Sequence, residues 1–142
     1  MPRKDHVSEL YHLIYLSRLS PEASASCVAG IVRASRLRNQ MAQISGLLVF
    51  DGARFCHYLE GPAATVCSLA DRIRTDGRNT DFRVIHQAEF DGPPLLPQHG
   101  LEYALSYDEH LECFERSEGP MSFLLFRDLM PAFDMAPGCQ AS

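Results

Sequence analysis

Apolar residues follow two different spacings along the chain, and these spacings predict five strands and two long helices. The strand-like segments are short and dense in aliphatic and aromatic residues, and they cover 10–17, 44–50, 54–60, 82–90 and 101–107. Between the second and third of these segments, Asp51 and Gly52 favour the positive φ values of a tight turn. The two strands should therefore form an antiparallel hairpin.

Two longer segments repeat apolar residues at helical spacing. We expect the first helix to begin at Ser20, with Pro21 in its first turn, and to end near Asn39. The second should begin at Pro62 and stop near Gly77, because glycine accepts the left-handed conformation of a helix cap.

The order strand, helix, strand, strand, helix, strand, strand (βαββαββ) is typical of the ferredoxin-like α+β fold, in which two crossover helices cover one face of a sheet. Residues 91–100 contain several prolines and glycines and should form an exposed loop before the last strand. Two short amphipathic helices are expected in 109–114 and 122–129. We expect these C-terminal helices to bury their apolar residues by covering the second face of the sheet or by forming a dimer interface. Those residues are Leu111, Phe114, Phe123, Leu124 and Phe126.

Composition places the chain among single-domain proteins of a reducing compartment. Its 142 residues, 46% of them hydrophobic, suit one domain with a real core. A net charge of −5 argues against binding nucleic acid, which needs a basic surface for the phosphates. No stretch approaches the roughly 18 apolar residues of a membrane span, and the first residues lack the apolar core of a signal peptide. The five cysteines are odd in number and form no C-x-x-C pair, so we expect a cytoplasmic protein without a membrane partner.

The chain lacks the short motifs that mark common enzymes and metal sites. Its six histidines show no H-E-x-x-H or other paired ligand spacing. Neither a G-x-S-x-G elbow nor a phosphate-binding P-loop or G-x-G-x-x-G is present. We therefore expect neither a metal site nor substrate turnover.

Three polar residues stand in otherwise apolar elements and should face one another. Tyr15 lies in the first strand, Asn39 at the end of the first helix and His57 in the third strand. A buried phenol, amide and imidazole each need hydrogen-bond partners, which the carbonyl and N–H groups of a heteroaromatic ligand would supply. The alternative is that all three are partly exposed and bond to backbone or water. Spacing alone leaves both interpretations open.

Four segments together resemble the BLUF family, the sensors of blue light using FAD. They are LIYLS (13–17), SRLRNQMAQISGLLVFDG (35–52), FCHYLEG (55–61) and DRIRTDGRN (71–79), and the similarity runs without a gap from Tyr15 to about residue 85. The resemblance implies a flavin inserted between the two crossover helices. FAD is expected, with FMN, riboflavin or no flavin as alternatives. It also implies a flavin-binding domain over 8–107 and a helical C-terminal extension over 108–142.

The resemblance assigns roles to individual residues. Tyr15 matches the tyrosine that is photo-oxidised in the family, and Asn39 matches the asparagine that bonds the C4 carbonyl region of the flavin. The other positions are Arg72, Asp76 and Arg78 on the polar side of the flavin, Ile31 and Leu48 against its ring, and Tyr103 and Leu105 for signal output, where the family usually has Trp-Ser-Met. A solvated helix face is the alternative for the three charged residues, and plain core packing is the alternative for Ile31 and Leu48.

One central position departs from the family pattern. The family motif F-x-Q-x-L-E-G has a glutamine where this chain has His57. An amide carries two donors on one atom and an acceptor on another, whereas a neutral imidazole has one donor and one acceptor on opposite sides of its ring. His57 should therefore bridge Tyr15 and the flavin in one tautomer at a time. We predict that flavin binding survives, and that the small red shift of absorption on illumination is absent or altered.

Two functions of different classes are consistent with these observations. The first is a flavin-binding blue-light sensor that signals by conformational change to a downstream protein partner, as a homo-oligomer. The second is a protein-interaction module on the same fold whose photochemistry is lost or altered. An acylphosphatase-like enzyme ranks below both, because the sequence shows no phosphate-binding loop that brings an Arg and an Asn together.

Overall fold

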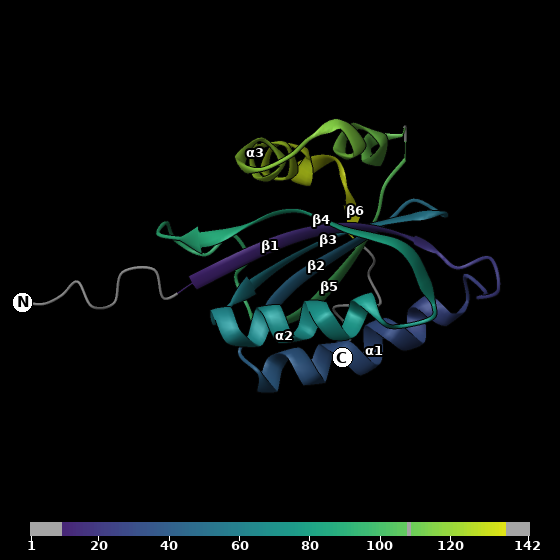
Figure 1. Ribbon diagram of the computed structural model, residues 1–142, viewed down its shortest axis with the longest axis horizontal. Helices are drawn as coiled ribbons and strands as arrows, with labels where there is room; N and C mark the ends of the chain where they lie inside the picture. Colours follow the sequence, from purple (N-terminus) through teal and green to yellow (C-terminus); the bar gives the residue numbers. More distant parts are fainter. Residues whose placement is uncertain (1–9, 108, 136–142) are drawn as a thin grey trace, which may run out of the picture.

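A computed structural model describes residues 10–107 and 109–135, in which a six-stranded sheet separates two long helices from the C-terminal helices (Figure 1). The strands are β1 (Leu10–Leu19), β2 (Ser45–Phe50), β3 (Arg54–Gly61), β4 (Asn79–Phe90), β5 (Gly100–Leu105) and β6 (Asp134–Met135). The helices are α1 (Cys27–Met41), α2 (Ala63–Arg74) and α3 (Pro120–Leu129), with 3₁₀ helices η2 (His110–Arg116) and η3 (Met130–Ala132).

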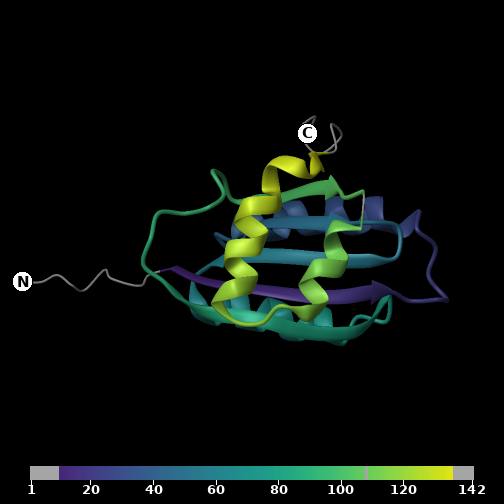
Figure 2. The ribbon, with the colours of Figure 1, turned by 90° about the horizontal axis from the view of Figure 1, so that it is seen from above.

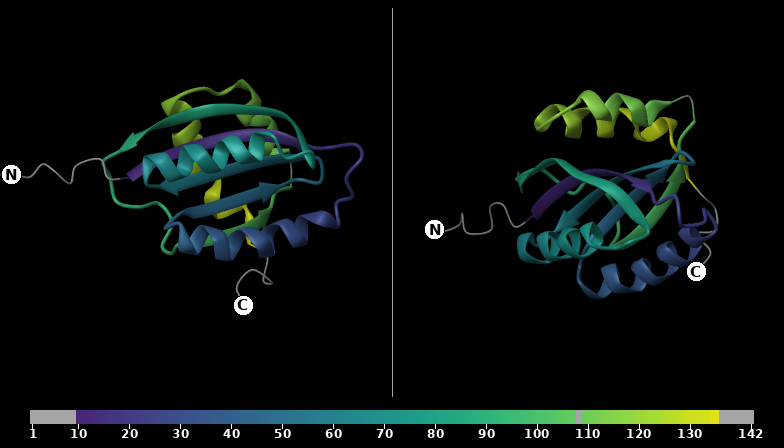
Figure 3. Two further views of the ribbon diagram at one scale, coloured as in Figure 1. Left: turned by 60° about the horizontal axis from the view of Figure 1, so that its bottom comes forward. Right: turned by 45° about the vertical axis from the view of Figure 1, so that its right-hand side comes forward.

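The sheet has the strand order β4-β1-β3-β2-β5-β6. β1 pairs antiparallel with both β3 and β4, β2 pairs antiparallel with β3, and β5 runs parallel to β2. Helix α1 connects β1 to β2 across β3, and α2 connects β3 to β4 across β1, so both crossovers lie on one face of the sheet (Figure 3). The ferredoxin-like prediction with two crossover helices on one face is confirmed.

Strand alternation gives the sheet two apolar faces, because successive side chains of a strand point to opposite sides. On β1, Leu13 and Tyr15 pack with Val66 and Leu69 of α2, whereas Ile14 belongs to the core on the other face. A third apolar cluster lies under α1 and contains Val28, Val32, Leu48, Phe50, Phe55 and Leu101. The helix face of the sheet is thus divided between α1 and α2.

The C-terminal elements cover the opposite face of the sheet, as Figure 2 shows for α3 and η2. Leu111, Phe114 and Phe126 are 0% exposed in the core of that face, and Phe123 packs against it. Leu124 instead points outward, with 39% of its surface exposed. Covering of the sheet, one of the two expected fates of these apolar residues, is therefore observed. In the described part of the chain no helix combines the length and the apolar character needed to cross a membrane.

The predicted start of the first helix is wrong, because α1 begins at Cys27 and not at Ser20. The Ser20 backbone N–H donates to the carbonyl of Arg78 at 2.9 Å, and the Ser20 hydroxyl accepts a bond from the Glu22 N–H at 3.3 Å. Ser20 therefore ends the strand and closes a turn. The Ser20 carbonyl accepts a bond from the Ala23 N–H at 3.0 Å, so this segment forms a tight turn instead of the first turn of an α-helix.

The predicted end of the second helix also needs correction. Helix α2 ends at Arg74, and Gly77 is not among the glycines with positive φ, so it forms no left-handed cap. The side chain of Asn79 instead donates to the carbonyl oxygens of Ile73 and Asp76 at 3.1 and 2.8 Å, which satisfies the end of the helix. The first C-terminal helix, η2, is a 3₁₀ helix.

Candidate functional site

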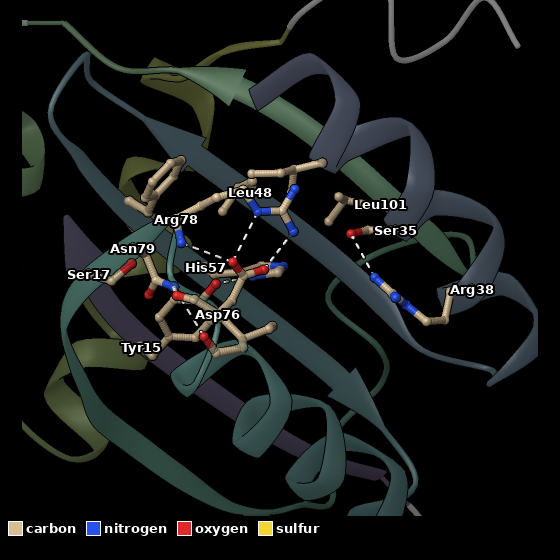
Figure 4. A pocket seen from close by; sticks show the side chains of 13 residues that line it. Tyr15, Ser17, Ser35, Arg38, Leu48, His57, Asp76, Arg78, Asn79 and Leu101 are labelled. Carbon is tan, nitrogen blue, oxygen red and sulfur yellow. Dashed lines mark hydrogen bonds and ion pairs between the residues drawn. The ribbon is translucent and has the colours of Figure 1, made fainter. Parts of the chain in front are cut away.

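A cleft with a volume of about 80 Å³ opens between α1 and α2, with the sheet as its floor (Figure 4). The strands contribute Tyr15, Ser17, Leu48, Phe55, His57, Asn79 and Leu101 to its lining. Ile31, Ser35 and Arg38 come from α1, Ile73 from α2, and Asp76 and Arg78 from the turn after α2. The cleft therefore combines apolar side chains with a few polar groups at its floor and its rim, as is usual for a site that binds a small molecule.

A second hollow of about 320 Å³ lies along the same pair of helices. Its lining includes Asn39 from α1 and Arg72 from α2. Because Arg38 lines both the cleft and this hollow, the two are neighbours in one groove.

Tyr15 and His57 form a buried hydrogen-bonded pair at the floor of the cleft. They stand opposite each other in the β1–β3 ladder, and the Tyr15 hydroxyl lies 2.9 Å from His57 Nδ1. Only 4% of each residue is exposed. Burial lowers the pKa of the His57 imidazole to about 3 and raises the pKa of the Tyr15 phenol above its ordinary value. Both groups are therefore neutral near pH 7, and the two share one hydrogen bond.

Gly46 of β2 provides the space for the His57 ring. A Cβ atom at position 46 would lie 3.1 Å from His57 Nε2, 3.1 Å from a methyl of Leu101 and 3.2 Å from a methyl of Leu59. These contacts are tighter than ordinary van der Waals packing, so a larger residue would displace the imidazole. Because glycine has no side chain, position 46 leaves the space in which Nε2 of His57 lies.

Several buried polar atoms around the groove have no hydrogen-bond partner within the described part of the chain. They are Ser17 Oγ, His57 Nε2 and Asn79 Oδ1 in the cleft, and Asn39 Oδ1 in the second hollow. Buried polar atoms in proteins are nearly always bonded, so this clustering indicates a ligand with its own donors and acceptors. The Asn39 amide already donates to the Gly100 carbonyl at 3.2 Å, so its oxygen is free to accept. A flat ring with carbonyl and N–H groups, such as a flavin, fits this set.

Asp76 and Arg78 form an ion pair at the rim of the cleft (Figure 4). Arg78 Nη2 lies 2.6 Å from Asp76 Oδ2, and Arg78 Nε donates to Asp76 Oδ1 at 3.0 Å. These bonds hold the pKa of the Asp76 carboxyl below its usual value and raise the pKa of Arg78. The charges are thereby fixed in place beside the ligand space.

The structure gathers the predicted binding residues along this groove. Tyr15, Ile31, Leu48, His57, Asp76 and Arg78 line the cleft, and Asn39 and Arg72 line the second hollow. Tyr103 and Leu105 lie outside both linings and pack against the apolar cluster under α1. Tyr103 pairs with the cleft residue Leu48 in the β2–β5 ladder. Their role in signal output stays a prediction.

Sequence reasoning missed part of the lining. Ser17 and Phe55 stand two residues from Tyr15 and His57 on their strands, so strand alternation could have placed them on the same face. Helical spacing from Ile31 could likewise have indicated Ser35 and Arg38. Asn79 and Leu101 carry no such signal, since only the folded chain brings them to the cleft. Among residues 10–107 and 109–135, no group of three or more His, Cys, Asp or Glu side chains is arranged to hold a metal ion.

A family model gives this site its context. The model for sensors of blue light using FAD (BLUF) matches residues 10–92, which is more than half of the chain. The matched region contains the residues that line the cleft, apart from Leu101.

Comparison with individual proteins is consistent with this family. The photoactivated adenylate cyclase subunit beta of Euglena gracilis is 36% identical over 76 residues, which cover 54% of this chain and 9% of that protein. The subunit alpha of the same organism is 34% identical over 91 residues, covering 61% of this chain and 9% of that protein. The chain therefore matches only a small part of these relatives. The dark-state structure of the BLUF protein BlrB covers 87% of this chain and 96% of its own, with a TM-score of 0.74 and 25% identity.

Proposed function

The chain belongs to the BLUF family of sensors of blue light using FAD, and on that premise we propose that it binds FAD between α1 and α2 and detects light through Tyr15 and His57. One observation carries the proposal. The hydrogen-bonded pair Tyr15–His57 lies buried at the floor of an otherwise open cleft, and the second ring nitrogen of His57 has no partner. The unpartnered atoms Ser17 Oγ, His57 Nε2 and Asn79 Oδ1 favour the sensor, because a protein-interaction module without flavin would have no ligand to bond them.

The residues along the groove suit the parts of a flavin. Ile31 and Leu48 would pack against the ring, and Asn39 Oδ1 would accept a bond from its N–H. The guanidinium groups of Arg72 and Arg78 would stabilise negative charge on its carbonyl side, with Asp76 holding Arg78 in place. When bound, the flavin supplies absorption of blue light and an electron acceptor.

The proposed switch is the position of one proton on His57. If Nε2 carries the hydrogen, Nδ1 accepts a bond from the Tyr15 hydroxyl and Nε2 offers a donor to the ligand. If Nδ1 carries it, Nδ1 donates to the Tyr15 oxygen and Nε2 offers a lone pair. Tyr15 lies 2.9 Å from Nδ1 and is therefore the residue from which a proton can reach it. In this exchange the Tyr15 hydroxyl proton moves to Nδ1, while the Nε2 proton and the electron left on Tyr15 would pass to the flavin, so that the imidazole stays neutral. Nε2 is thereby converted from donor to acceptor without moving the ring.

We also propose that the signal passes to a protein partner after the light step. The Euglena relatives are named photoactivated adenylate cyclases, and in them a region similar to this chain is a small part of a larger protein. By analogy, this chain would act on a partner as a cytoplasmic homo-oligomer. FAD, rather than another flavin, is proposed from the family description.

Replacing His57 by glutamine should restore the red shift of absorption that glutamine-bearing members of the family show on illumination. The reason is that a rotating glutamine amide can bring a donor to the place where its oxygen stood, whereas the proposed tautomer exchange turns Nε2 of His57 from a donor into an acceptor. The measurement is a light-minus-dark absorption spectrum of the FAD-loaded protein. We expect the red shift in His57→Gln and an altered absorption change, without that red shift, in the wild type.

His99→Gln, on the exposed loop before β5, serves as the control and should behave like the wild type. A wild-type spectrum with the same red shift as His57→Gln would show that the imidazole replaces the amide fully, contrary to the proposed switch. Failure of the purified protein to take up FAD at all would refute the proposed function.

A further inference from the structure

Four polar side chains form a buried chain of contacts on the face of the sheet opposite the cleft. They are His86 of β4, His12 of β1, and Tyr58 and Glu60 of β3, which are 8%, 3%, 0% and 1% exposed. His86 Nε2 lies 2.9 Å from His12 Nε2, His12 Nδ1 lies 3.5 Å from the Tyr58 hydroxyl, and that hydroxyl donates to Glu60 Oε1 at 2.7 Å. None of these residues lines the flavin cleft.

The hydrogen bonds among these four residues all donate in one direction, from His86 towards Glu60. Because the single hydrogen of the Tyr58 hydroxyl goes to Glu60, the Tyr58 oxygen can only accept from His12. His12 must then carry its hydrogen on Nδ1, which leaves Nε2 to accept from His86. The longest link, His12 Nδ1 to Tyr58 at 3.5 Å, is at the limit of a hydrogen bond. A small displacement between β1 and β3 would therefore make or break it.

The chain of contacts reaches two elements on this face of the sheet, the loop between β4 and β5 and helix α3. Glu60 accepts bonds from the backbone N–H groups of Leu95 and Leu96 at 3.1 and 2.9 Å, which fixes the loop between β4 and β5. From α3, Phe123 packs 4.7 Å from the His12 ring and Phe126 stacks 5.4 Å from the Tyr58 ring. A rearrangement of Tyr58 or His12 would thus change contacts with the loop and with α3.

The same pair of strands carries the light-sensing residues on its other face. In the β1–β3 ladder Tyr15 stands opposite His57, Ile14 opposite Tyr58, and His12 opposite Glu60. A change in the Tyr15–His57 bond therefore acts on the two strands whose relative position sets the His12–Tyr58 contact. Tyr103 and Leu105, by contrast, pack on the cleft side under α1.

We propose that His86, His12, Tyr58 and Glu60 form the output element of the sensor, which transmits a change at Tyr15–His57 through the β1–β3 ladder to the 91–99 loop and α3. This inference rests on the proposed function for its trigger. Its coupling can be measured without flavin or light, because the contacts belong to the protein alone.

The test uses Tyr58→Phe, which keeps the ring against α3 and removes the hydroxyl. Amide hydrogen exchange of Leu95 and Leu96 is the readout, since both amides depend on Glu60. In flavin-free protein Tyr58→Phe should raise their exchange by about tenfold, because Glu60 loses a partner. Tyr107→Phe is the matched control, because it removes an exposed hydroxyl bonded to Asp134 at 3.2 Å, and it should leave these amides unchanged.

Coupling to the cleft is tested by combining substitutions on the two faces. Tyr15→Phe should change the exchange of Leu95 and Leu96 by about fivefold in the otherwise wild-type chain and have no effect in the Tyr58→Phe background. If Tyr15→Phe leaves these amides unchanged in the otherwise wild-type chain, the output route is wrong, whether or not the protein responds to light.

In FAD-loaded protein, illumination should alter exchange at Leu95, Leu96 and α3 in the wild type and in Tyr107→Phe. Tyr58→Phe should keep the absorption response and lose the exchange response. Light-induced changes confined to β5 and β6 would overturn the proposal in favour of output through Tyr103 and Leu105. Absence of any absorption response would count against the proposed function alone, since the flavin-free coupling still decides the output route.

Discussion

Tyr15→Phe should abolish the light-induced absorption change of the FAD-loaded protein and leave the domain folded. The Tyr15 hydroxyl faces His57 Nδ1 at 2.9 Å, so its removal takes away the proton source of the proposed switch. The phenylalanine ring keeps the contact with Phe82, whose ring centre lies 4.5 Å away. We expect a loss of about 1–3 kcal/mol in the free energy of unfolding, because one neutral hydrogen bond disappears and His57 loses a partner.

The control for this prediction lies on the same strand. Tyr11→Phe removes a hydroxyl that donates to Gln87 at 3.0 Å, away from the cleft. It should keep the full absorption change. Light-minus-dark spectra and urea unfolding of both variants make the comparison, and a Tyr15→Phe protein that still responds to light would exclude Tyr15 from the switch.

Acid should destabilise the flavin-free protein well above the pH at which its buried histidines take up protons. Burial lowers the pKa of His57 to about 3 and that of His12 to about 4, the latter also through the neighbouring His86, and burial lowers the pKa of His86 as well. Unfolded histidines bind protons below about pH 6.5, while the folded ones stay neutral. The unfolded state therefore binds more protons, and stability falls as the pH drops from about 6.5 towards 3.

The fully buried His57 alone should account for about 2 kcal/mol of this loss at pH 5. Urea unfolding at pH 7.5 and pH 5 measures the loss in the wild type and in His57→Gln. We expect the loss to be smaller by about that amount in His57→Gln, since glutamine does not titrate, and to be unchanged in His99→Gln on the exposed loop. An equal loss in the wild type and His57→Gln would contradict the assignment of a neutral, buried imidazole.

The architecture could be predicted from the sequence, because its strands and helices have clear patterns of apolar residues. Short segments dense in aliphatic and aromatic residues predicted the strands of the ferredoxin-like core, and the helical spacing of apolar residues predicted the two crossover helices. Element ends were less accessible. Ser20 is a residue type that often caps a helix, but the backbone after it closes a turn at Ala23, and α1 begins only at Cys27.

The candidate site was accessible in part, for a similar reason. Tyr15, Asn39 and His57 stand out as polar residues in apolar elements, and the family resemblance assigned them roles. The contact between Tyr15 and His57 depends on strand register, because the two residues face each other only in the β1–β3 pairing observed.

The buried contacts among His86, His12, Tyr58 and Glu60 could not be predicted from the sequence. His12 and His86 lie 74 positions apart and show no ligand-like spacing, so the sequence gives no reason to expect a contact between them. Their contact arises because β4 and β1 are neighbours and both side chains point to the same face.

The central claim is that the groove between α1 and α2 holds the flavin, and blocking that groove tests it most directly. Ile31→Trp would place an indole in the cleft, whereas Leu37→Trp adds the same group to a position on α1 that is 61% exposed and outside the lining. Titration of flavin-free protein with FAD, followed by flavin fluorescence, gives the affinity of each variant. The account predicts that Leu37→Trp binds FAD like the wild type and that Ile31→Trp binds it about tenfold more weakly or not at all, with both variants folded. Equal affinity of the two variants would contradict it.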